Sequence, residues 1–82
     1  MVRSGNCEEA VPWFEKARTL RPDDVRLLNS LGQCLIHVED FPAAEEVYST
    51  SYRLNQGQAH VKQILTELER LRGLEAQRRN NL

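Results

Sequence analysis

The feature that most restricts how this chain can fold is a repeat of its own residues at a spacing of 34 positions. Residues of the first copy return as the same or a similar type in the second: Ala10 and Ala44, Phe14 and Tyr48, Ala17 and Ser51, Leu20 and Leu54. A fixed period of this length is typical of helix-turn-helix units stacked in an array. The period therefore predicts an all-α fold.

The residue types at these positions carry a family resemblance. In the second copy they are Leu28, Leu31, Gly32 and Leu35, followed by Ala44, Tyr48 and Ser51. This pattern resembles the tetratricopeptide repeat family, which places large, Leu, Gly and aromatic residues in its first half and Ala, aromatic and Ala in its second. The chain departs from the family where Leu35 replaces an aromatic residue, Ser51 an alanine and Gln56 a proline. The first copy matches at Gly5, Asn6, Ala10, Phe14, Ala17 and Pro22, so the resemblance covers residues 1–56.

The resemblance implies an antiparallel helix-turn-helix solenoid fragment of about four helices. Its expected parts are the second half of a truncated repeat (1–22), a complete repeat (23–57), a C-terminal capping helix (58–73) and a polar flexible tail (74–82). Helical spacing and capping signals predict helices over 7–20, from the Asp23–Asp24 turn to 37, from the turn at 39–40 to 54, and over 59–72. Pro12 predicts a kink in the first helix. Gly32 lacks a Cβ and predicts a close approach of its helix to the next one, with Ala44 opposite.

Composition argues against several classes of function. A net charge of −1 excludes a strong electrostatic case for nucleic-acid binding. No segment is apolar enough to span a membrane, and the first residues have no signal-peptide core. Cys7 and Cys34 are too few and wrongly spaced for a zinc site; we expect Cys34 to be a buried free thiol, which favours a reducing, cytoplasmic location.

Catalysis has little support in the sequence. His37 and His60 have no nucleophile or carboxylate at a motif spacing. The acidic pairs lie near predicted helix starts, where the helix dipole favours negative charge; they are Glu8 with Glu9, Asp23 with Asp24 and Glu45 with Glu46. We therefore predict no catalytic residues, no metal and no cofactor.

Binding is the function that the resemblance implies. In this family the first helix of each repeat lines a concave surface. The positions that point into it are here Arg26, Asn29, Gln33, Ile36 and His37, and the capping helix adds His60 and Gln63. These side chains suit an extended peptide of a partner protein, with Arg26 meeting an acidic group. The alternative is an ordinary solvated helix face.

Two further hypotheses concern the ends of the chain. A first helix without its usual partner leaves a surface around Ala10, Trp13, Phe14 and Ala17 without its cover. Either the chain is a fragment of a longer array, or a second copy covers this surface, which would then be a homo-oligomer interface. Arginines near the C-terminus suggest a contact with RNA or an anionic surface, although glutamates interleave with them and dilute the field; these arginines are Arg70, Arg72, Arg78 and Arg79.

Overall fold

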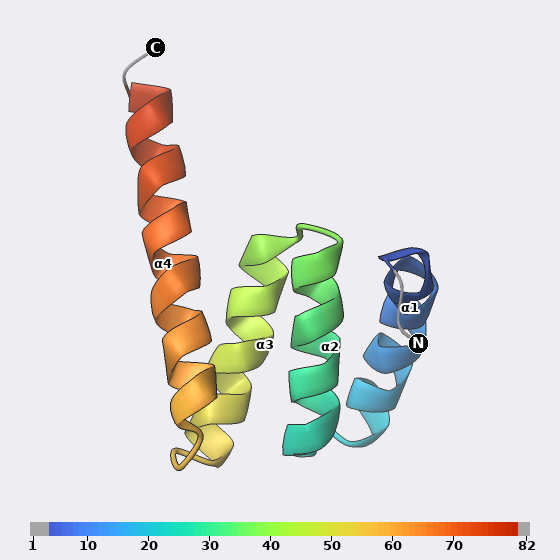
Figure 1. Cartoon of the computed structure of the whole chain (residues 1–82). Coiled ribbons are helices and arrows are strands. Elements are labelled where there is room, and N and C mark those ends of the chain that lie inside the picture. Colours follow the sequence, from blue (N-terminus) through green and yellow to red (C-terminus); the bar gives the residue numbers. More distant parts are fainter. Residues whose placement is uncertain (1–3, 81–82) are drawn as a thin grey trace.

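The computed structural model describes residues 4–80. This part of the chain forms four helices: α1 (Ser4–Leu20), α2 (Val25–His37), α3 (Phe41–Leu54) and α4 (Ala59–Asn80). Each helix runs antiparallel to the one before it and packs beside it, so that α2 and α3 lie in the middle of a single row (Figure 1). The all-α class and the helical repeat fold are thereby confirmed.

Aspartate caps place the starts of α2 and α3 where the sequence predicts them. The carboxylate of Asp24 accepts a hydrogen bond from the backbone N–H of Leu27 at 3.2 Å, and that of Asp40 accepts one from the N–H of Ala43 at 3.4 Å. Each bond satisfies an amide that has no partner within the first helical turn. Pro42 fits the first turn of α3 because no backbone N–H is needed there.

The core lies between α2, α3 and the first half of α4. Its buried members are Leu28, Leu31, Leu35, Ala44, Val47, Tyr48, Val61 and Leu68. Gly32 is also buried, and a Cβ built on it would lie 2.6 Å from the nearest ring carbon of Tyr48. The predicted close approach at Gly32 is confirmed, and the group that occupies the space is the Tyr48 ring.

The predicted helix bounds are wrong at two places. α1 begins at Ser4 rather than Cys7 and continues through Pro12 as one helix. α4 does not end at Arg72 but continues through Gly73 to Asn80, so the stretch from 74 to 80 is helical rather than a flexible tail. Gly73 does not have the positive φ of a glycine that ends a helix. The residues after it, Leu74, Glu75, Ala76 and Gln77, have high helix propensity.

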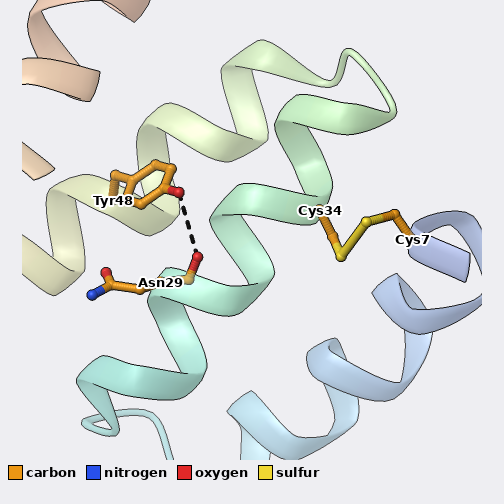
Figure 2. Close-up of a disulfide and its surroundings, with 4 residues drawn as sticks. All are labelled: Cys7, Asn29, Cys34 and Tyr48. Atoms are coloured by element: carbon orange, nitrogen blue, oxygen red, sulfur yellow. Dashed lines mark hydrogen bonds between the residues drawn. A yellow bond between two sulfur atoms is a disulfide. The ribbon is translucent and has the colours of Figure 1, made fainter. Parts of the chain in front are cut away.

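The prediction of a free thiol at Cys34 is also wrong. Cys34 and Cys7 form a disulfide whose Cα atoms are 4.9 Å apart (Figure 2). Because α1 and α2 are antiparallel and joined by a short turn, the start of α1 lies beside the end of α2, and each of these ends carries one cysteine. The argument for a reducing compartment, which rested on that free thiol, therefore loses its basis.

Candidate functional site

A groove runs between α2 and α4, which are parallel to each other because α3 separates them in the chain. Its first part is a hollow of about 420 Å³. The residues that line it are Asn29, Ser30, Gln33, Ile36, His37, Tyr48, His60 and Ile64. Most of them offer an amide, hydroxyl or imidazole, so this part is the polar end of what we call the α2–α4 groove.

The second part of the α2–α4 groove is a hollow of about 440 Å³ that shares Ile36, His60 and Ile64 with the first. Its other lining residues are Phe41, Gln63, Glu67, Leu68 and Leu71. Phe41, Leu68 and Leu71 add phenyl and aliphatic groups here to the two isoleucines that both parts share. The groove therefore changes along its length from hydrogen-bonding groups to an apolar surface.

The structure brings six of the seven predicted binding residues together in this groove: Asn29, Gln33, Ile36, His37, His60 and Gln63. Gln33, His37, His60 and Gln63 are exposed, and Ile36 is half-buried. Arg26 is exposed but is not among the lining residues, since it lies in the first turn of α2.

Asn29 differs from the other predicted residues because its side chain is used within the fold. The Ser51 hydroxyl donates to Asn29 Oδ1 at 2.6 Å, and Asn29 Nδ2 donates to Gln58 Oε1 at 2.6 Å. Gln58 Nε2 closes the ring by donating to Ser51 Oγ at 3.1 Å. Each side chain in this Asn29–Ser51–Gln58 ring both donates and accepts a hydrogen bond, so Asn29 joins α2 to α3 and to the start of α4.

Tyr48 lines the groove and is hydrogen-bonded to the backbone of Asn29. Its hydroxyl donates to the backbone oxygen of Asn29 at 3.4 Å (Figure 2). Burial raises the pKa of the Tyr48 hydroxyl above its ordinary value of 10.0. The phenol is therefore neutral throughout the physiological range and acts here as a hydrogen-bond donor.

Several groove residues were not predicted as site residues. Ile64, Leu68 and Leu71 belong to the apolar stripe of the fourth helix, which the sequence pattern assigned to packing. The signal that could have identified them is the width of that stripe. Leu71 and Leu74 remain exposed beside the start of α3, and with Phe41 they line a further hollow of about 210 Å³.

The four residues of the predicted oligomer interface do not share one exposed surface. Phe14 packs against the core, and Ala10 and Ala17 are half-buried. Trp13 is 71% exposed, and the ammonium of Lys16 lies 5.6 Å from the centroid of its ring. Only Trp13 of this set is available to a partner as it stands, and the interface itself stays a prediction.

The two described arginines of the predicted anionic contact are engaged in ion pairs. Arg70 Nη2 lies 2.9 Å from Glu67 Oε2, and Arg72 Nη1 lies 2.8 Å from Glu45 Oε1. The side chains of Arg78 and Arg79 lie outside the described residues. Within the described part, no cluster of three or more His, Cys, Asp or Glu is placed to hold a metal ion. No helix of that part has the length and apolarity needed to cross a bilayer.

Comparison with known proteins agrees with this architecture. A family model described as tetratricopeptide repeat matches residues 1–68. The match takes in α1, α2, α3 and the portion of α4 that lines most of the groove. Among curated proteins, none matches this chain.

Proposed function

This chain belongs to the tetratricopeptide repeat family, whose members are protein-interaction modules, and from that premise we propose that the α2–α4 groove binds a segment of a partner protein. The observation that supports it most directly is the continuity of the groove. Two hollows share Ile36, His60 and Ile64, so one ligand can contact both the polar and the apolar end. In this proposal residues 23–57 form the complete repeat, and α4 caps it.

The partner segment that fits such a groove combines backbone polar groups with apolar side chains. Gln33 on α2 and Gln63 on α4 are exposed on opposite walls, and their amides can both donate to and accept from a peptide backbone. Ile36 and Ile64 between them offer contacts for aliphatic side chains. Arg26, exposed in the first turn of α2 and outside the lining residues, is suited to an acidic group of the ligand.

Binding a partner segment requires no catalytic reaction by the chain. Repeats of this family are generally non-catalytic scaffolds, and they act through protein partners. We propose accordingly that this module has no catalytic residues and requires no cofactor. Its specificity then depends on which exposed groups line the α2–α4 groove.

A selection of random peptides displayed on phage provides the test. The tightest selected peptide is synthesised with a fluorophore, and its dissociation constant is measured by anisotropy for the parent chain and for variants. We expect Gln33→Arg and Gln63→Arg to weaken binding at least tenfold, since each adds a long charged group to the groove. Gln56→Arg is the matched control, because Gln56 is exposed in the α3–α4 connection and is not among the groove residues; it should leave binding unchanged. Binding that both groove variants leave unchanged would refute the proposal.

The exposure of Trp13 favours one second candidate, which is self-assembly. The indole of Trp13 is a large, mostly apolar group, and 71% of the residue is exposed. Tryptophan is enriched at protein interfaces. Light scattering over a wide concentration range tests it, with Trp13→Ala alongside. Self-assembly predicts a dimer mass that falls to the monomer value in the variant, whereas a monomer at every concentration would exclude it.

A further inference from the structure

One face of α1 points away from the rest of the fold. α1 stands at the end of the row of helices (Figure 1) and packs inward with the side that carries Cys7 and Phe14. On its opposite side an open hollow of about 420 Å³ is lined by four exposed residues. They share a face because residues three, four and seven apart lie above one another on a helix. This outer face of α1 consists of Glu9, Pro12, Trp13 and Lys16.

The outer face of α1 carries opposite charges at its two ends. Glu9 and Lys16 are about two helical turns apart, with Pro12 and Trp13 between them. Among the residues that the structure describes, neither charge has an ion-pair partner; the ammonium of Lys16 lies near the Trp13 ring instead. Both charges are therefore available to opposite charges of a partner.

The order of these four side chains is complementary to itself when a second copy of α1 lies antiparallel. Positions 9 and 16 have the same midpoint as positions 12 and 13. A two-fold axis through that midpoint places Glu9 of each copy opposite Lys16 of the other, and Trp13 opposite Pro12. Every contact of a two-fold interface occurs twice, so two Glu–Lys pairs flank two indole–proline contacts. Parallel helices in the same register would instead bring like charges together.

A helix of a preceding repeat fits this face less well than a second copy does. The 34-residue period matches the positions of Glu9 and Lys16 with Ala43 and Thr50 of α3. In α3 these positions are uncharged and half-buried, as expected where helices of one repeat array pack together. Burying a charge is costly unless an opposite charge accompanies it. A second copy supplies that opposite charge for both Glu9 and Lys16.

We propose that the outer face of α1 joins two copies of this chain as an antiparallel α1–α1 pair, with Trp13 at its centre and the Glu9–Lys16 pairs setting its register. The proposal rests on the self-assembly candidate above and specifies its geometry. Leu20, 83% exposed, lies one turn after Lys16 and extends the apolar contact. The pair leaves the α2–α4 groove free, because no residue of α1 lines that groove.

Sedimentation equilibrium of the full chain and of charge-reversed variants tests the antiparallel pair. A contact between two single helices is small, so we expect a monomer–dimer equilibrium in the range of about 10 μM to 1 mM. Glu9→Lys and Lys16→Glu each convert two attractive contacts into two repulsive ones. Each variant alone should therefore raise the dissociation constant of the dimer about tenfold or more.

Restoring the complementary charges separates this register from a general loss of folding. An equal mixture of the Glu9→Lys and Lys16→Glu chains should form a mixed dimer as tight as the parent, because each contact then joins one Lys and one Glu. The double variant with both substitutions should dimerise with itself for the same reason. Glu69→Lys is the matched control, because it makes the same charge change at an exposed position of α4; it should leave the dissociation constant unchanged.

The outcomes distinguish this proposal from the two on which the function rests. A dimer that both single variants leave intact, or one that neither the mixture nor the double variant restores, would overturn the antiparallel pair while self-assembly itself stands. A monomer at every concentration would overturn both. Peptide binding in the α2–α4 groove should be the same for Glu9→Lys as for the parent chain, so the groove is tested independently of the dimer.

Discussion

Replacing Gly32 by alanine tests the closest packing contact in the fold. The added Cβ would lie 2.6, 2.8 and 2.9 Å from three ring carbons of Tyr48, whereas carbon atoms in ordinary contact are roughly 3.5–4.0 Å apart. The ring is not free to turn aside, because Tyr48 is buried and its hydroxyl donates to the backbone oxygen of Asn29. Either the ring or α3 must therefore move by about 1 Å.

Two effects of opposite sign decide the stability of Gly32→Ala. Alanine is favoured over glycine inside a helix by about 1 kcal/mol. Overpacking a well-filled core costs about 1–3 kcal/mol, and a clash with a buried ring belongs in the upper part of this range. We therefore expect a net loss of about 1–2 kcal/mol in the free energy of unfolding.

Gly73→Ala is the matched control, because Gly73 is also helical but has no atom within 4 Å of the added Cβ. Only helix propensity acts there, so this variant should gain up to about 1 kcal/mol. Urea unfolding followed by far-ultraviolet circular dichroism measures both variants; the fluorescence of Trp13 is unsuitable because this residue is exposed. The packing argument is refuted if Gly32→Ala proves as stable as the parent chain.

Three other perturbations follow from the same structure. Cys7→Ser removes a cross-link that closes a loop with a sequence separation of 27, so urea unfolding should show a loss of about 3–4 kcal/mol in the free energy of unfolding. An unchanged free energy of unfolding would mean that the disulfide is absent. Burial raises the pKa of Tyr48, so the folded protein keeps the hydroxyl proton to a higher pH than the unfolded chain does. The stabilisation that comes from this protonated hydroxyl is complete below pH 10 and declines as the pH rises further. Unfolding curves between pH 9 and 11 should therefore show a smaller decline for Tyr48→Phe. Asn29→Ala deprives the buried groups of Ser51 and Gln58 of a partner each and should cost about 2–4 kcal/mol; a loss below about 0.5 kcal/mol would contradict the ring of hydrogen bonds.

The bounds of α2 and α3 were predictable because their determinants are local. Asp24 and Asp40 cap these helices through bonds to amides three residues further on. The apolar residues at helical spacing mark the buried faces, and the repeat pattern singled out Gly32 as the point of close approach. Each of these signals lies within one helix or in the turn before it, so one sequence is enough to find it.

The cystine and the end of α4 were not predictable in the same way. The pairing of Cys7 with Cys34 depends on how far α1 and α2 are shifted along their axes relative to each other. This shift is set by the packing of the two helices. Gly73 resembles a helix stop by residue type alone. It continues the helix because its backbone keeps a negative φ and because good helix formers follow it. In both cases the outcome depends on other parts of the chain than the residue on which the prediction was based.

Asn29 shows the limit of assigning a ligand role from a position in a repeat. The pattern places its side chain toward the groove, and the structure agrees about the place. Whether the amide can bind a ligand depends on Ser51 and Gln58, which lie 22 and 29 residues away in the chain and take up its oxygen and nitrogen. A buried polar ring of this kind is costly to break. In the binding role that we propose for the α2–α4 groove, recognition therefore depends on residues whose polar groups still face solvent, above all Gln33 and Gln63, while Asn29 joins α2 to α3 and to the start of α4.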